Sequence, residues 1–373
     1  RLEQAGTHQG QRREVSELSS RYASPAMVRL WSAEHRARLW RRLWLALAEE
    51  QRRLGLDIPE RAIAEMRAHL DDVDLDAVRA HERRLRHDVM AHIHAFGDQA
   101  PAARPYLHLG ATSAFVTDNA DLIVLRDSGR LLLGRLVAVL RALRDFALRY
   151  RSLPTVAYTH FQPAQLTTVG KRAALWLQDF ALDTAALREA IDTLPFRGCK
   201  GTTGTQASFL ELFGGNHEKV RQLDRRLATA FGFAQSLPIT GQTYTRKIDS
   251  RTVDVFAGIA QSAAKLGTDL RLLQHEGEVL EPAEAEQVGS SAMPYKRNPV
   301  RSERICALSR YLIALRDNTA HTAATQWLER SLDDSANRRL VLPESALAAD
   351  AILILVTNVS AGLEVREPTI RRA

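Results

Sequence analysis

The sequence has few cysteines and few long apolar runs. Only Cys199 and Cys306 occur in 373 residues, and neither lies in a CxxC pair, which argues against a disulfide framework or a structural zinc site. No uninterrupted apolar run reaches the roughly 18 residues that span a bilayer. The nearest, 346–359, is interrupted by Asp350 and Asn358 and predicts a helix buried among other helices. Nor does a leader pattern open the sequence, so we expect a soluble, cytoplasmic protein with no membrane partner.

Lysine is also scarce: the chain has six lysines among 51 basic residues. An ammonium and a guanidinium differ in geometry and hydration. A lysine in such an arginine-rich sequence therefore indicates a position where a compact ammonium is required. Four of them, Lys171, Lys200, Lys247 and Lys296, lie in segments dense in polar motifs. The net charge of +7 admits a polyanionic partner. However, the arginines are scattered through amphipathic stretches such as 36–53, where they predict solvated faces, so no nucleic-acid partner is expected.

What the sequence does contain is helical periodicity. Apolar residues recur at intervals of three and four, which predicts an all-α fold. Ser32 is expected to cap a helix that runs to Arg53, a second helix should begin after Pro59, and a third should run from Leu75 to Phe96. Longer helices are predicted over 118–150, 165–193, 216–232, 249–276, 300–320 and 335–363. Helices of this length usually pack as a bundle.

The most informative stretch is 289–304, which reads GSSAMPYKRNPVRSER. Its glycine and prolines predict a loop that leads into a helix near Pro299. Such a loop can direct backbone N–H groups and the side chains of Ser290, Ser291, Lys296 and Asn298 at one point, where they would stabilise charge that develops on an oxyanion.

Further polar clusters lie between or within the predicted helices. The Arg21-Tyr22 pair could hold a phosphate or carboxylate. The cluster Arg86-His87-Asp88 is expected inside a helix. His92 and His94 lie near it, but the spacing of these histidines does not give the i, i+4 pattern of two ligands on one helix face, so no metal site is predicted.

Five more segments carry candidate functional groups. Thr112 and Ser113 could bind an anion at a helix N-terminus or simply cap it. Thr159 and His160 precede a helix in a turn-rich loop, and a histidine is the usual proton carrier near neutral pH. The segment 198–208 is glycine-rich without being a P-loop. The remaining candidates are Gln242, Arg330, Arg339 and Ser335, the last of which is expected to cap the final long helix.

Taken together, the motifs resemble those of the adenylosuccinate lyases. The core GSSAMPYK is similar to the signature of the wider fumarase and aspartase superfamily, and RHDVMAH, THFQPAQ, KGTTGTQASF and LDDSANRR resemble the purine enzymes specifically. The resemblance covers nearly the whole chain. It implies reversible β-elimination of fumarate from adenylosuccinate, giving AMP, and from succinyl-aminoimidazole carboxamide ribotide, without a cofactor.

The resemblance also implies residue roles. Ser290 would be the general base, His160 the general acid, and Glu303 the carboxylate that orients His160, while Lys296 and Asn298 would stabilise the aci-carboxylate. The residues implied to bind substrate are Arg21, Tyr22, Arg86, His87, Asp88, Thr112, Ser113, Thr159, Gln242, Arg304, Arg330, Ser335 and Arg339.

The resemblance finally implies an organisation into domains and subunits. We expect an N-terminal helical domain over 1–111, a central bundle over 112–364 and, over 365–373, the stub of a C-terminal helical domain that is largely absent from this chain. The segments 131–148 and 340–359 carry more apolar surface than one neighbour would cover. This surface predicts an obligate homo-oligomer, and the resemblance implies a homotetramer with a 20-helix core and sites shared between subunits. The alternatives are another lyase activity of the superfamily, such as that of argininosuccinate lyase or fumarase, or a non-catalytic homologue.

Overall fold

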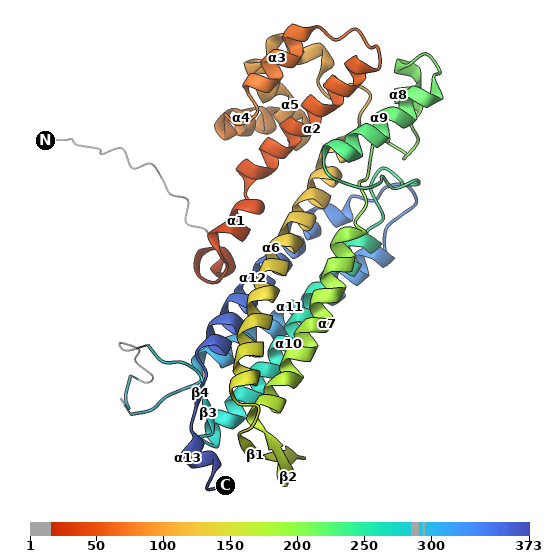
Figure 1. Ribbon diagram of the computed structural model, residues 1–373. Coiled ribbons are helices and arrows are strands. Elements are labelled where there is room, and N and C mark those ends of the chain that lie inside the picture. The colour runs from red at the N-terminus through yellow and green to blue at the C-terminus, as the bar shows by residue number, and fades with distance from the viewer. Residues whose placement is uncertain (1–15, 285–290, 294) are drawn as a thin grey trace, which may run out of the picture.

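The computed structural model describes residues 16–284, 291–293 and 295–373. Five long helices run side by side and form the bundle, namely α6, α7, α10, α11 and α12 (Figure 1). Their bounds are Ser113–Arg149, Val169–Asp192, Lys247–His275, Val300–Ala324 and Asp333–Ala361. This architecture confirms the predicted all-α class.

Shorter helices gather at one end of the bundle (Figure 1). They are α2 (Ala33–Arg53), α3 (Glu60–Ala68), α4 (Leu75–Leu85), α5 (Asp88–Gln99), the 3₁₀ turn η2 (Pro101–Tyr106), α8 (Ala207–Leu212) and α9 (His217–Ala230). A short π-helix, η1 (Leu18–Tyr22), and α1 (Pro25–Leu30) precede α2. The predicted cap of α2 is confirmed, since Ser32 Oγ accepts a hydrogen bond from His35 N at 3.1 Å.

The opposite end of the bundle carries the small sheets. Strands β1 (Pro154–Thr159) and β2 (Gln162–Thr168) form an antiparallel hairpin, and β3 (Val279–Leu280) pairs with β4 (Glu364–Val365) beside α13 (Glu367–Ile370). These strands were not predicted. The helix expected from residue 165 begins only at Val169, because Thr168 caps α7 by accepting a hydrogen bond from Lys171 N.

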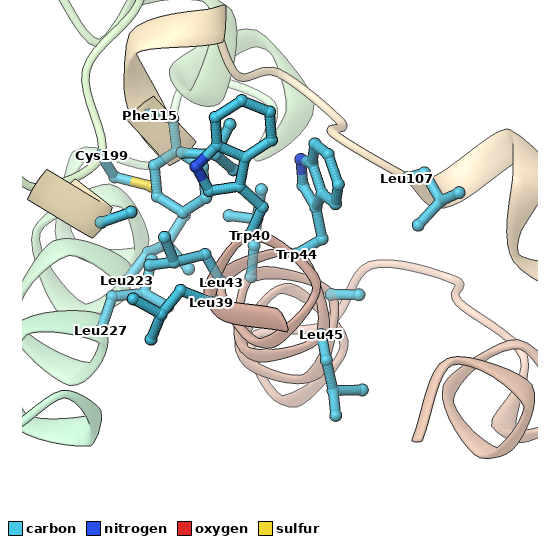
Figure 2. Close-up of a cluster of buried hydrophobic side chains, with 14 of the residues drawn as sticks. Leu39, Trp40, Leu43, Trp44, Leu45, Leu107, Phe115, Cys199, Leu223 and Leu227 are labelled. Carbon is cyan, nitrogen blue, oxygen red and sulfur yellow. The ribbon is translucent and has the colours of Figure 1, made fainter. Parts of the chain in front are cut away.

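Two hydrophobic cores hold these parts together. One joins α2 to the first turns of α6 and to 196–244; in Figure 2, Leu39 and Leu43 of α2 lie beside Leu223 and Leu227 of α9. Burying one such leucine fully contributes about 2 kcal/mol. The other core fills the bundle. The domain boundaries stay a prediction.

Helix α12 is long and apolar enough to cross a membrane, but 67% of its most apolar window is buried inside the structure. It packs against α6, α10 and α11. The predicted burial of the run 346–359 among other helices is therefore confirmed.

The sequence predicted that the arginines of α2 lie on a solvated face, and this prediction is wrong for one of them. Arg41 is 2% exposed, because its guanidinium lies 4.6 Å from the Phe96 ring and donates to Gln99 Oε1 at 2.7 Å. Burial lowers the pKa of Arg41 to about 10. Arg41 therefore acts as a core residue that ties α2 to α5.

Candidate functional site

A cavity of about 490 Å³ lies where the N-terminal helices meet α6 and α12. It brings together eight side chains that the sequence had marked as binding residues, although they are up to 252 positions apart. These eight are His87, Asp88, Thr112, Ser113, Gln242, Arg330, Ser335 and Arg339. The cavity therefore assembles most of the predicted substrate-binding set.

The segment Arg86-His87-Asp88 does not lie within one helix, contrary to the prediction of a helix from Leu75 to Phe96. Arg86 ends α4 in the left-handed conformation, with φ of 55°, and His87 caps α5 by accepting a hydrogen bond from Met90 N at 3.2 Å. This break turns His87 and Asp88 into the cavity, whereas Arg86 is not among the residues that line it.

Asp88 and Arg339 form an ion pair in the wall of the cavity. Arg339 Nη2 lies 2.5 Å from Asp88 Oδ2. Burial by itself would raise the pKa of Asp88, but the Arg339 guanidinium outweighs it and lowers this pKa. The pair presents a fixed carboxylate next to a partly exposed guanidinium, an arrangement suited to a ligand that is both anionic and a hydrogen-bond donor.

Thr112 and Ser113 open α6, the longest helix. Thr112 is the N-cap but makes no side-chain cap hydrogen bond. Ser335 does not cap α12 as expected, because the helix begins at Asp333 with Leu332 as N-cap. The hydroxyls of these residues therefore line the cavity beside a helix N-terminus, where an anion is favoured.

Gln242 is fixed through its backbone. Its N–H donates to Glu329 O at 2.9 Å, and its carbonyl accepts hydrogen bonds of 2.5 and 3.0 Å from the guanidinium of Arg197, which is fully buried. Close packing continues at Gly204, where an added Cβ would lie 1.9 Å from Thr240 O. The glycine-rich segment 198–208 therefore supports the cavity wall and does not line it.

A network of buried charges forms the floor of the cavity. Arg246 donates to Asp334 Oδ2 at 2.6 Å and to both carboxylate oxygens of Asp118 at 3.1 and 3.2 Å. Arg338 pairs with Asp249 at 2.7 Å and with Asp121 at 2.9 Å. Burial raises the pKa of Asp121, although Arg338 opposes that effect.

Sequence reasoning missed this network. Asp118 and Asp121 are three residues apart, which places them on one face of α6, but nothing in their residue types distinguished that face from a solvated one. Nothing in the sequence distinguished Arg246 and Arg338 from the other arginines, of which the chain has 45 in all.

A second group of predicted residues meets beside η1. The Tyr22 ring lies close to two guanidiniums, with Arg21 Cζ and Arg304 Cζ each 5.5 Å from its centroid. Arg304 comes from the first turns of α11, so the contact links η1 to the helix that follows the signature segment. None of these three residues lines the cavity described above.

Thr159 and His160 lie at the opposite end of the bundle, at the tip of the β1–β2 hairpin (Figure 1). His160 therefore stands in a β-turn and not in a loop before a helix. Thr159 pairs with Gln162, which leaves His160 and Phe161 alone in the turn, with φ of 53° and 56°. The imidazole is exposed and available to a ligand.

The signature segment is described in part. Ser290 lies outside the described residues. Lys296 is exposed, and its N–H donates to Met293 O at 3.0 Å. Asn298 lies just before α11 and Glu303 in its first turn, where Pro299 is the N-cap. Among the described residues, no hydrogen bond or ion pair joins Glu303 to His160, so this pairing stays a prediction.

In the described part of the chain, no group of three or more His, Cys, Asp and Glu side chains is placed to hold a metal ion. Cys199 and Cys306 are both free and buried.

Comparisons with known proteins identify the family of the chain. A family model described as "Lyase" matches residues 54–312. The adenylosuccinate lyase of Saccharomyces cerevisiae is 50% identical over 95% of this chain and 74% of its own length. That of Schistosoma mansoni is 49% identical over 93% of this chain and 72% of its own length.

Solved structures show the same fold. A 3-carboxy-cis,cis-muconate lactonizing enzyme from Pseudomonas putida superposes with a TM-score of 0.83 at 25% identity, covering 95% of this chain and 78% of that one. A fumarate lyase from a Mesorhizobium species gives 0.80 at 27% identity, covering 94% and 78%. With sequence identity near one half across almost its whole length, the chain belongs to the adenylosuccinate lyases of the lyase family.

Proposed function

We propose that this protein eliminates fumarate from adenylosuccinate, giving AMP, and from succinyl-aminoimidazole carboxamide ribotide, giving the carboxamide ribotide. The observation that carries the proposal is the cavity, which joins Arg330 and Arg339 to the hydroxyls of Thr112, Ser113 and Ser335. Guanidiniums and hydroxyls at helix N-termini suit a substrate that bears one phosphate and two carboxylates.

The proposed chemistry begins at the carbon next to a carboxylate. Ser290, as its alkoxide, removes the Cβ proton, and the electron pair passes into the adjacent carboxylate to give an aci-carboxylate. Lys296 and Asn298 stabilise that charge. The electron pair then forms the double bond of fumarate as the C–N bond breaks, and His160 protonates the departing nitrogen.

Several copies of the chain would be needed to complete one site, and we propose a homotetramer with shared sites. In one chain, the cavity and the His160 turn lie at opposite ends of the bundle. Large apolar side chains also remain open on the bundle surface, with Leu175 45%, Leu182 65% and Leu340 64% exposed. A second copy that covered them would bring distant parts of the site together. Because its substrates are purine nucleotides, we propose that the enzyme works in the cytoplasm.

The activity is tested by following fumarate release from adenylosuccinate. We expect Ser290→Ala and His160→Ala each to lower kcat by about 10² or more, the usual contribution of a general acid or base. Argininosuccinate and malate serve as control substrates that identify another lyase activity. Full turnover in either variant would remove that residue from its proposed role.

Shared sites are tested by mixing two inactive variants. His160→Ala and Arg330→Ala chains, unfolded and refolded together, should regain activity if one site takes these residues from different chains. Each variant refolded alone is the control. A monodisperse monomer in light scattering at micromolar concentration, or no activity in the mixture, would contradict the shared tetrameric site.

A further inference from the structure

The turn that carries His160 is built from unfavourable residues. A two-residue hairpin with positive φ at both central positions has the signature of a type I′ turn, which favours Asn-Gly. Here the two positions hold His160 and Phe161, with φ of 53° and 56°. Histidine is tolerated there more often than most residues, but a bulky phenylalanine is a conformational outlier. Strain of this kind costs about 1–3 kcal/mol per residue and persists only where the surroundings enforce it.

The enforcing contacts begin at Tyr158. Its ring lies 5.8 Å from the Phe161 ring at an interplanar angle of 40°. Its hydroxyl donates to Glu278 Oε1 at 3.1 Å. Tyr158 therefore connects the side chain of the strained residue to a buried carboxylate immediately before β3.

Glu278 is the fixed point of this arrangement. It is 1% exposed, and its other oxygen accepts from Thr155 Oγ1 at 3.3 Å and from Arg172 Nη1 at 3.5 Å. Arg172, from α7, also donates to Val156 O at 2.7 Å. One carboxylate and one guanidinium thus hold strand β1 at three positions.

An irregularity in the strand makes this clamp possible. Residues three apart in a regular strand point to opposite faces. The pairing of β1 with β2 shifts between Val156 and Tyr158, and a bulge of this kind redirects the side chains that follow it. Thr155 and Tyr158 can therefore both reach Glu278.

We propose that Phe161, Tyr158 and Glu278 are positioning residues that hold the His160 imidazole at one place and orientation. The inference rests on the proposed role of His160 as general acid. Without these contacts, the tip of the hairpin would no longer be held in place, and the imidazole would sample positions from which it cannot deliver a proton to the departing nitrogen. A misplacement of about 1 Å at a reacting group costs on the order of 10²-fold in rate.

The decisive variant is Phe161→Gly, because a structural role and a positioning role predict opposite results. Glycine adopts positive φ without strain, so the melting temperature should stay the same or rise. The variant keeps the turn type but loses the ring contact with Tyr158, so the turn is no longer held in one place, and kcat for adenylosuccinate should fall about 10- to 100-fold with KM nearly unchanged. Phe161→Tyr keeps the ring and is the matched control, with expected activity near that of the wild type.

Two further variants probe the rest of the clamp. Tyr158→Phe keeps the ring contact but removes the hydroxyl that donates to Glu278, and Glu278→Gln keeps an acceptor but removes the charge that pairs with Arg172. Each should lower kcat more than it changes KM. If Phe161→Gly instead raised KM at constant kcat, Phe161 would be a substrate contact and the proposal would be overturned.

A double-mutant cycle separates this inference from the proposed function. If His160→Ala leaves kcat unchanged, the general-acid role itself fails. If His160→Ala lowers kcat but Phe161→Gly does not, only the positioning inference fails. If each single variant lowers kcat, Phe161→Gly should have no further effect on kcat in a chain that already carries His160→Ala, because the two residues then act through one group.

Discussion

Arg246 and Asp334 form an ion pair from which water is almost wholly excluded, with Arg246 Nε 2.6 Å from Asp334 Oδ2 and side chains 2% and 0% exposed. The other oxygen of Asp334 lies 2.8 Å from Arg330 Nη1, so one buried carboxylate orients a guanidinium that lines the cavity. This relationship links the buried floor of the cavity to a guanidinium that we propose binds substrate.

We expect Asp334→Asn to weaken both the fold and substrate binding. Removing one partner of a buried ion pair leaves the other charge uncompensated, which costs about 3–5 kcal/mol in the free energy of unfolding. Freed from its carboxylate, Arg330 should bind the substrate less well, so KM should rise. Urea unfolding and steady-state kinetics measure the two effects. Asp333→Asn, at an exposed neighbouring position, is the control and should cost less than about 1 kcal/mol.

The sequence predicted the long helices well because their apolar period extends over many turns and Ser32 is an unambiguous cap. The prediction failed where the backbone conformation of a single residue turns the chain and ends a helix. A helix spanning 75–96 was expected, but Arg86 adopts a left-handed conformation that the residue type does not announce. A turn-rich loop was expected at His160, but the β1–β2 hairpin was missed, since His-Phe does not resemble the usual residues of a hairpin turn.

For the candidate site, local motifs marked eight of the side chains that line the cavity but not the buried charges that form its floor. His87, Gln242 and Arg339 lie in recognisable segments, and the structure brings them together. The buried roles of Arg246 and Arg338 depend on carboxylates from distant helices, and no local pattern records such partners.

We expect Gly204→Ala to distort the cavity wall. Gly204 has φ of 84°, and its added Cβ would lie 1.9 Å from Thr240 O, a backbone atom close to Gln242. The free energy of unfolding should fall by more than about 1 kcal/mol, and KM should rise as Gln242 is displaced. Gly134→Ala on α6 is the matched control, because its Cβ would meet nothing within 4 Å; it should be neutral or stabilise by up to about 1 kcal/mol. Equal behaviour of the two variants would contradict the packing described around Gly204.

Acid should destabilise the N-terminal helices through His108. Trp44 Nε1 donates to its Nδ1 at 2.9 Å, and burial, with a smaller contribution from His87, lowers the pKa of His108 to about 4 from an ordinary value of 6.5. The folded-state pKa lies below the unfolded one, so this stability is fully present above pH 6.5 and is lost as pH falls through 4. In His108→Asn, urea unfolding should depend less steeply on pH across that window. Identical slopes in variant and wild type would exclude this role of His108.

Asp183 should have the opposite pH dependence. This carboxylate lies between α7 and α10, where burial and the nearby Asp179 raise its pKa to about 6 although Ser262 Oγ donates to it at 2.5 Å. The folded-state pKa exceeds the ordinary value of 3.8, so its contribution to stability is fully present below pH 3.8 and is lost as pH rises through 6. The ionised carboxylate is therefore a cost at neutral pH. Asp183→Asn, which keeps an acceptor for Ser262, should raise the melting temperature at pH 8 and have little effect at pH 4. A melting temperature at pH 8 that falls would mean that the charge itself is needed there, for instance by a cation from another copy of the chain.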